Sequence, residues 1–110
     1  MKKLLLGALL IFLIPLMVWA NNIIFYSPGT ASLTTTPSQI LTSNSLRKYL
    51  ILVNTGSNTV IIKTGAAPAS STDGIPIPAG GNWEPFQAPG NSIYGRAVTG
   101  TSTIEYQQGN

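Results

Sequence analysis

RKYLILVNTGSNTVIIKTG, residues 47–65, is the stretch that decides the fold class of this chain. Two runs rich in β-branched and apolar side chains, residues 47–54 and 59–64, flank the polar tetrapeptide Thr55-Gly56-Ser57-Asn58. Such runs favour strands, and a short polar connection with glycine is typical of a hairpin turn. The pattern therefore predicts a β-hairpin. Its first strand is apolar on both faces, which predicts a central place in a sheet, with Arg47 at the entry end.

Shorter runs of strand-like composition precede this stretch. Residues 22–27 (NIIFYS) are β-branched and aromatic, and the pair Pro28-Gly29 that follows favours a turn. Residues 31–45 are rich in Ser and Thr and are interrupted by Pro37, which lacks a backbone donor. We expect this region to supply one or two short edge strands.

The ribbon GIPIPAGGNWEPF, residues 74–86, has the pattern of another edge. Ile75 and Ile77 recur at the period of a strand, so both are expected to face the same way, while the intervening prolines leave one side without ladder donors. The double glycine at residues 80–81 predicts a turn, and residues 82–87 a returning strand. The chain closes with two more strand-like runs about Thr99-Gly100.

These patterns predict an all-β fold, a small antiparallel β-sandwich or barrel, preceded by one N-terminal hydrophobic helix that is a signal or an anchor. The expected boundaries are residues 1–20 for the signal peptide or transmembrane anchor, 21–30 for a linker or first strand, and 31–110 for the β-sandwich domain.

The N-terminal segment MKKLLLGALLIFLIPLMVWA carries no charge from residue 4 to residue 20. As a helix this run would reach about 26 Å, slightly less than the ~30 Å hydrocarbon core of a bilayer. Pro15, and the small residue Ala20 at a possible cleavage position, favour a cleaved signal peptide, and a retained anchor fits as well. In both cases Lys2 and Lys3 stay on the cytoplasmic side and the rest of the chain is exported. The residues expected to contact lipid are represented by Leu4, Ile11, Leu16 and Trp19.

The composition removes most catalytic chemistry. The chain contains no histidine and no cysteine, so the usual general base, the thiol nucleophile, disulfides and most transition-metal ligand sets are absent. Of the three acids, Asp73 and Glu105 are expected to be solvated, and Glu84 to lie at a rim. A hydrolase that uses Glu84 and Asp73 is a distant third hypothesis, so we expect no enzyme, no cofactor and no metal.

The remaining charge is close to balanced. Lys2 and Lys3 account for two of the six Lys and Arg residues, which leaves four cations against three anions in the rest of the chain. Nucleic acid is therefore not an expected partner. Trp83, Phe86 and Tyr94 are the candidate subunit or ligand contacts, because aromatic side chains are common in the cores and interfaces of small β-domains.

The order of these motifs, over residues 45–108, resembles a small β-sandwich domain of bacteriophage structural proteins. The matching segments are RKYLILVN (47–54), the turn TGSN (55–58), VIIKTG (60–65), GIPI (74–77) with Gly80-Gly81, and NSIYG (91–95). They correspond to the loose patterns R-x-x-L-x-I-x-N, V-x-V-x-x-G, G-I-x-I-x-x-G-G and A/N-x-I-Y of that domain. The apolar N-terminal segment departs from it, because soluble phage head proteins rarely need an export signal.

The resemblance implies a non-enzymatic virion component of capsid-associated, vertex or decoration type. It also implies that Ile75 and Ile77 face the core of the domain. Its expected partners are other virion proteins, copies of itself and, through the N-terminal segment, a membrane. The expected location is the virion, including its internal membrane, or otherwise the host envelope or periplasm. The alternative is an exported bacterial β-sandwich binding module for carbohydrate or a cell-surface partner, with Trp83, Phe86 and Tyr94 as its contacts.

Overall fold

The computed structural model describes residues 25–110, and the expected N-terminal helix, with Leu4, Ile11, Leu16 and Trp19, lies outside this part of the chain. Residues 25–110 form eight β-strands in two antiparallel sheets, and they include no helix long and apolar enough to cross a membrane. Sheet A contains β1 (Tyr26–Leu33), β8 (Ser102–Gly109), β3 (Tyr49–Asn54) and β6 (Asn82–Trp83), in that spatial order. Sheet B contains β2 (Ser38–Leu41), β7 (Ile93–Ala97), β4 (Val60–Thr64) and β5 (Ile75–Ile77), also in that order.

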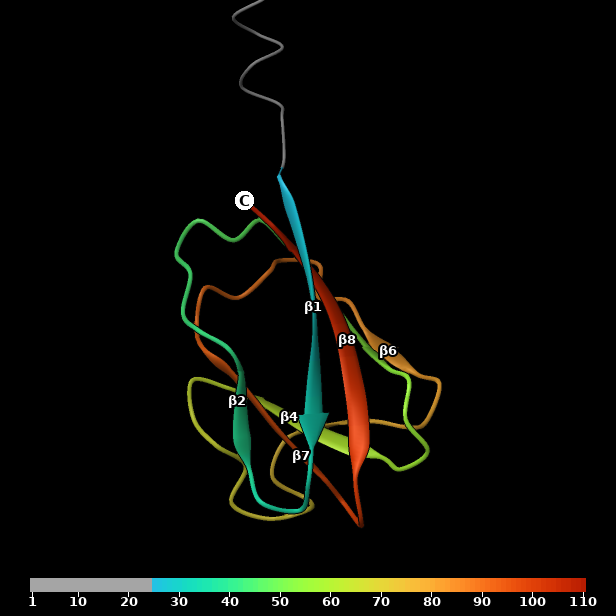
Figure 1. Ribbon diagram of the computed structural model, residues 1–110. Coiled ribbons are helices and arrows are strands. Elements are labelled where there is room, and N and C mark those ends of the chain that lie inside the picture. Colours follow the sequence, from blue (N-terminus) through green and yellow to red (C-terminus); the bar gives the residue numbers. More distant parts are fainter. Residues whose placement is uncertain (1–24) are drawn as a thin grey trace, which may run out of the picture.

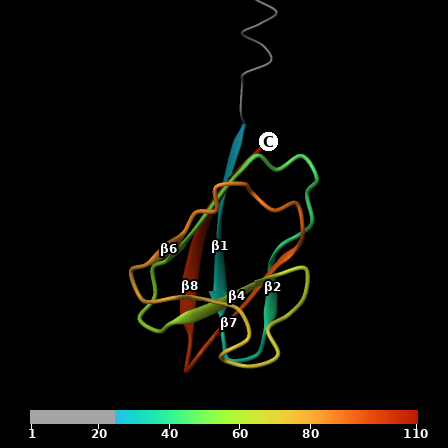
Figure 2. The same cartoon turned by 180° about the vertical axis from the view of Figure 1, so that it is seen from behind.

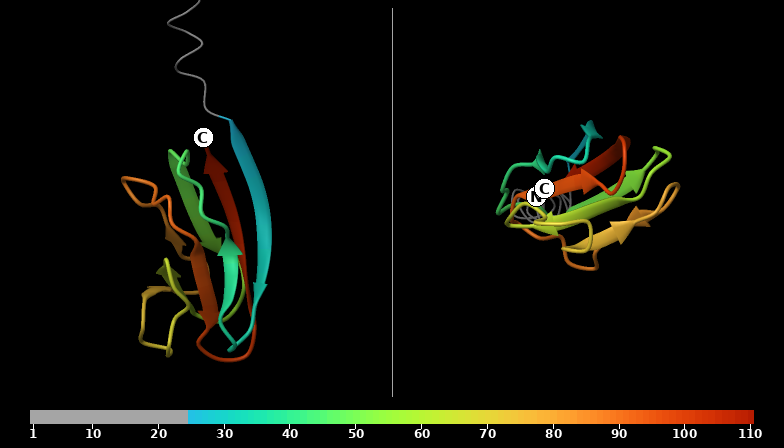
Figure 3. Two further views of the ribbon diagram at one scale, coloured as in Figure 1. Left: turned by 90° about the vertical axis from the view of Figure 1, so that its left-hand side faces the viewer. Right: turned by 90° about the horizontal axis from the view of Figure 1, so that it is seen from below.

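The strand order is that of a jelly roll, an eight-stranded sandwich of two sheets. Strands that follow one another in the chain alternate between the sheets, except that β4 and β5 are neighbours in sheet B. Figure 1 and the reverse view in Figure 2 show the two layers, and Figure 3 shows them from the side and from below. The expected β-sandwich is therefore confirmed, and the chain passes from one sheet to the other and back along its length.

The predicted hairpin at residues 47–65 is wrong. Both of its strands form, as β3 and β4, but β3 pairs with β8 and β6 in sheet A, and β4 pairs with β7 and β5 in sheet B. The polar turn between them carries the chain from one sheet to the other. The central position of the first strand is confirmed, since β3 lies between β8 and β6.

Three local expectations also change. The pair Pro28-Gly29 lies inside β1, which pairs with β8 from end to end, so it makes no turn. At the edge strand β5, Ile77 is buried as expected, whereas Ile75 is 40% exposed at the start of the strand. The strand predicted at residues 82–87 is only the two-residue β6, because Pro85 and the segment after it leave the sheet.

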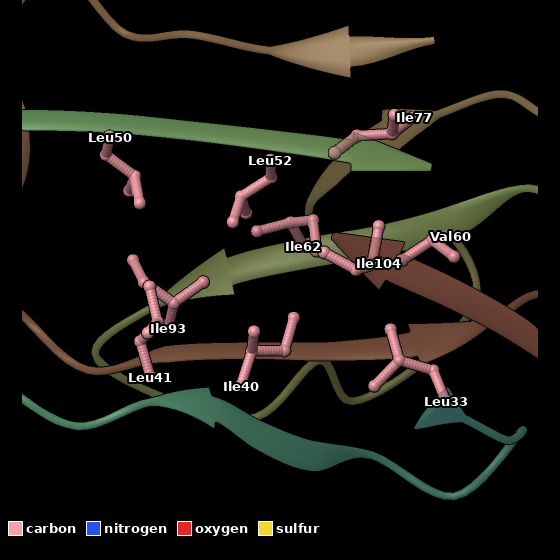
Figure 4. Packing of buried hydrophobic residues seen from close by; sticks show 10 residues of the cluster. All are labelled: Leu33, Ile40, Leu41, Leu50, Leu52, Val60, Ile62, Ile77, Ile93 and Ile104. Atoms are coloured by element: carbon pink, nitrogen blue, oxygen red, sulfur yellow. The ribbon is translucent and has the colours of Figure 1, made fainter. Parts of the chain in front are cut away.

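The core lies between the sheets and consists of aliphatic side chains from both. β3 alternates between buried positions, Leu50 and Leu52, and half-buried ones on the outer face, as a strand with one face in the core must. Figure 4 shows the side chains meeting in one layer. The cluster comprises Leu33, Ile40, Leu41, Leu50, Leu52, Val60, Ile62, Ile77, Ile93 and Ile104.

A buried arginine holds the end of the sandwich that carries both β1's start and the C-terminus. Arg47 is 5% exposed and makes four hydrogen bonds without a carboxylate partner among them. Its Nε donates to Gln108 Oε1 (3.0 Å), Nη1 to the carbonyls of Pro89 (2.6 Å) and Asn91 (3.0 Å), and Nη2 to that of Thr42 (2.8 Å). Burial lowers the pKa of this guanidinium. Arg47 thereby fastens two loops to β8.

A buried asparagine, Asn54, joins separate segments by hydrogen bonds at the other end of β3. Asn54 is fully buried, and its Nδ2 donates to the carbonyls of Asn58 (2.8 Å) and Ile77 (2.9 Å). Its Oδ1 accepts from the Gly56 amide (3.1 Å) and the Ser102 hydroxyl (2.8 Å). The side chain therefore ties the turn after β3 to β5 and β8. The two polar ends of the R-x-x-L-x-L-x-N run thus close the two ends of the core.

Candidate functional site

The outer face of sheet A is the open surface of the described domain. The strand alternation that buries Leu50 and Leu52 turns Ile51 and Val53 outward, where both stay partly exposed. On the neighbouring strand β8, Glu105 and Gln107 face the same way and are exposed. A shallow groove of about 700 Å³ runs over these residues. We call it the sheet A groove; its lining consists of Pro28, Gly29, Thr30, Tyr49, Ile51, Val53, Glu105, Tyr106 and Gln107.

The strand register places the lining of the groove in cross-strand rows. One row is Pro28, Gln107 and Ile51, and the next is Thr30, Glu105 and Val53. Each row therefore has a polar side chain of β8 at its centre, with an apolar residue of β3 on one side. Opposed residues on antiparallel strands lie about 5 Å apart, so the groove presents carboxylate and amide oxygens beside aliphatic surface.

Two tyrosines close one end of the groove. Tyr26 of β1 and Tyr49 of β3 both stand opposite Gly109 in the register, one on each side of β8. Since Gly109 has no side chain, the two rings meet above it, edge to face, with centroids 5.5 Å apart and planes at 83°. Gly109 is consequently buried.

The tyrosine pair also contacts an acid from the loop after β6. The Tyr49 hydroxyl donates to Glu84 Oε2 at 2.6 Å. This hydrogen bond, with smaller contributions from desolvation and the nearby negative charge, raises the pKa of Tyr49. Glu84 lies at the rim of the sheet, as expected, and its carboxylate fixes a phenol.

A second glycine shapes the β1 side of the groove. Gly29 stands opposite Tyr106 on β8, and the Tyr106 ring covers the place that a Cβ at residue 29 would occupy. Tyr106 is half-buried and packs against the core cluster. A side chain at position 29 would force the Tyr106 ring to move, so this close approach favours glycine inside the strand.

The outer face of sheet B is covered in part by the domain itself. Ile61 of β4 points outward between the core residues Val60 and Ile62 and yet is only 3% exposed. The segment joining β4 to β5 lies against it, because the backbone of Gly74 approaches the Ile61 side chain. The groove over sheet A thus lies open, whereas this part of sheet B is covered.

An ion pair fastens that covering segment. Lys63 Nζ lies 2.9 Å from Asp73 Oδ2, which also accepts from the Ala69 amide at 2.7 Å. The hydrogen bond that the Ala69 backbone amide donates, and then the hydrogen bond from Lys63, lower the pKa of Asp73. The expectation that Asp73 is a solvated turn former thus changes to a partly exposed carboxylate with two partners.

The three aromatic residues singled out from the sequence do not form one platform. Trp83, on β6, is half-buried against the core cluster. Tyr94 is half-buried on the outer face of sheet B, opposite Lys63, between the buried Ile93 and Gly95. Phe86 is fully exposed in the loop between β6 and β7. Their role as contacts stays a prediction for each residue separately.

The groove residues themselves were missed in the sequence, although a signal was present. Residues 49–53 are apolar at both alternations, which we interpreted only as the mark of a central strand. The structure covers only one face, so Tyr49, Ile51 and Val53 form an apolar strip on the surface. An apolar outer face on a strand of an antiparallel sheet is itself an indication of a contact surface.

The described residues supply little for acid–base or metal chemistry. Glu84 is bonded to Tyr49, Asp73 is paired with Lys63, and the exposed Glu105 lies on the groove floor. Within residues 25–110 no three acids, histidines or cysteines come together as a metal-binding group. The arrangement suits binding through apolar contact and hydrogen bonding.

Comparison with protein families and with curated protein sequences gives no match. Among the solved structures that match the fold are two that each have 13% sequence identity and a TM-score of 0.50. One is from work on Bacillus endospore appendages, described as a novel family of disulfide-linked pili, and the match covers 79% of this chain and 83% of that one. The other is a cupin 2 conserved barrel domain protein from Salinispora arenicola, and the match covers 76% of this chain but 61% of that one. At such identity the likeness extends to the fold alone, and residues 25–110 form a jelly-roll sandwich of the architecture that these proteins share.

Proposed function

We propose that this chain is a non-enzymatic structural protein of a virus, a membrane-anchored or exported virion component that assembles through its β-domain. It would be capsid-associated, of vertex or decoration type, with other virion proteins and copies of itself as partners. The observation that carries the proposal is the sheet A groove, an open and partly apolar surface on a domain whose other sheet is covered in part by its own loop.

The fold is compatible with this role, because jelly rolls are the domains of many viral capsid proteins. Apolar strips with polar neighbours, such as Ile51 and Val53 beside Glu105 and Gln107, have the composition of a subunit contact. The pilus subunit of the same fold is also a protein of an assembly. This chain contains no cysteine, so disulfides cannot join copies of this sequence as they join the subunits of those pili.

The second candidate is an exported binding module for carbohydrate or a cell-surface partner. The tyrosine pair at the end of the groove favours it, since aromatic rings and carboxylate or amide oxygens are the groups that sugars contact. Its ligand would lie over Tyr49, Ile51 and Glu105. Jelly rolls occur in lectin domains too, so the fold fits both candidates.

Co-sedimentation and intact mass test the virion proposal. A lysate of the producing cells is treated with nuclease and separated on a density gradient, and the chain is detected by mass spectrometry. We expect it in fractions that contain nuclease-resistant nucleic acid. A mass of 11.6 kDa there would mean that the N-terminal segment is retained, and a mass lower by 20 residues that it is cleaved. Recovery only in envelope or soluble fractions that lack such particles would contradict the virion role.

Two charge variants test whether the groove is the contact. Ile51→Lys and Glu105→Lys each place a cation on the groove floor, and we expect both to lower incorporation into particles. Thr99→Lys, at an exposed turn between β7 and β8, is the matched control and should assemble normally. If the chain is a binding module, Tyr49→Ala should abolish its retention on an oligosaccharide or cell-wall matrix. Incorporation into particles is then not a property of the chain.

A further inference from the structure

The exposed apolar side chains of the described domain are concentrated at one end. Five large apolar or aromatic residues in residues 25–110 are strongly exposed, and four of them are Phe25 (75%), Tyr26 (51%), Leu46 (68%) and Phe86 (103%). Phe25 and Tyr26 lie at the start of β1, Leu46 in the loop between β2 and β3, and Phe86 in the loop between β6 and β7. Figures 1 and 3 show the start of β1, the C-terminus and these two loops toward the same end of the sandwich.

Hydrogen bonds join these segments into one surface. The Phe25 carbonyl accepts from the Asn110 amide (3.1 Å), and Asn110 Oδ1 accepts from Asn44 Nδ2 (2.8 Å). The Asn44 amide then donates to the Gly90 carbonyl (2.8 Å), which connects the loop of Leu46 to the loop of Phe86. We call this surface, with its side chains Phe25, Tyr26, Leu46 and Phe86, the apolar end.

The loop of Phe86 has a second attachment there. Glu84, two residues earlier, accepts the hydrogen bond of Tyr49, and the Tyr49 ring packs against Tyr26. The exposed phenylalanine is therefore held close to the start of β1. Lys48 and Glu84 are both exposed, so this end carries one cation and one carboxylate.

The opposite end of the sandwich is polar. It consists of the four turns at residues 34–37, 55–59, 78–81 and 98–101, whose sequences are TTTP, TGSNT, PAGG and VTGT. These turns contain no leucine, isoleucine, methionine or aromatic residue. The domain is thus amphipathic from end to end.

The sequence places an uncharged apolar run close to the apolar end. The uncharged apolar run of residues 4–20 is followed by only four residues before Phe25. Five peptide units reach at most about 17 Å, so a run held in a bilayer keeps the apolar end next to the lipid headgroups. The apolar end thus lies where aromatic and aliphatic side chains are favoured at a membrane surface.

We propose that the apolar end rests on the lipid bilayer, with Leu46 and Phe86 in the interfacial region. The inference rests on the membrane-anchored form of the proposed function. Because the anchor and the apolar end belong to one chain, the contact is intramolecular in effect, and a weak affinity suffices to populate it. The sheet A groove is then held beside the membrane at a fixed orientation.

Site-directed fluorescence in vesicles tests this orientation. The chain has no native cysteine, so single cysteines can be labelled without background. Full-length protein carrying Ser45→Cys or Gln87→Cys at the apolar end, or Ser57→Cys or Thr99→Cys at the polar end, is labelled with an environment-sensitive dye. All four positions are exposed. The proteins are reconstituted into vesicles of phosphatidylcholine and phosphatidylglycerol that contain a headgroup nitroxide as quencher.

We expect quenching of the dyes at positions 45 and 87 to be at least about twofold stronger than at 57 and 99, because an eight-residue β1 separates the ends by about 26 Å. Leu46→Ser with Phe86→Ser should reduce the quenching at position 45 or 87 while the protein stays with the vesicles. Both side chains are exposed, so the double variant should fold normally.

The other outcomes separate the two proposals. Protein that floats with the vesicles but shows equal, weak quenching at all four positions overturns the orientation and leaves the anchored role. Protein that does not float with the vesicles overturns the anchored role and this inference with it.

Discussion

Replacing Asn54 by leucine should remove much of the stability of the domain. Leucine has a similar volume but leaves four polar groups without their partner: the carbonyls of Asn58 and Ile77, the Gly56 amide and the Ser102 hydroxyl. A buried hydrogen bond contributes about 1 kcal/mol, so the four together predict a loss of about 4 kcal/mol in the free energy of unfolding. Small domains have about 5–15 kcal/mol in total.

Equilibrium unfolding in urea measures this loss, with circular dichroism and tryptophan fluorescence as two probes. With a slope of about 2 kcal/mol per molar urea, the midpoint of Asn54→Leu should fall by about 2 M. The matched control is Asn82→Leu, at an exposed position of β6, where we expect a change within about 0.5 kcal/mol. A loss below about 1 kcal/mol for Asn54→Leu would refute the reasoning, because the four hydrogen bonds could not then be what holds the turn after β3 in place.

Three further predictions use the same measurement. Arg47→Met should lower the free energy of unfolding by about 3 kcal/mol or more, because it leaves the oxygen atoms that accept hydrogen bonds from Arg47 without a donor. Arg47→Lys should recover only part of this loss. Gly29→Val should destabilise by about 1–3 kcal/mol through collision with Tyr106, and combining it with Tyr106→Ala should cost less than the sum of the two changes. Folding lowers the pKa of Asp73, so its contribution should be present above the unfolded pKa of about 3.9 and fade as the pH falls below it. Asp73→Asn should remove that part of the pH dependence, and an unchanged acid profile would contradict the assignment.

The sequence predicted which residues form strands better than it predicted how the strands pair. Alternation and turn composition located the runs that become β3, β4, β5 and β8, because these depend on neighbours in the chain. Whether a polar turn closes a hairpin or carries the chain to the other sheet depends on distant partners. At Asn54 those partners are Ile77 and Ser102, which no local pattern near the turn reveals.

The candidate site shows the same limit. Apolar residues at both alternations of β3 were visible in the sequence, but not that Gly109 would let Tyr26 and Tyr49 meet above it. Burial of Arg47 was equally hidden, since an arginine at the start of a strand is normally solvated. Its four partners lie in three separate segments that only the jelly-roll winding brings together.

The full-length pairing of β1 with β8 has a mechanical consequence. Ladder hydrogen bonds lie perpendicular to the strands, so a pull along β1 loads all eight paired positions together, in shear. A pull at right angles to β1 would instead break the paired positions one after another. The strand β1, which begins directly after Phe25, thus has the pairing geometry that best resists tension along its axis. A domain tethered there would keep its fold while the particle or envelope around it moves.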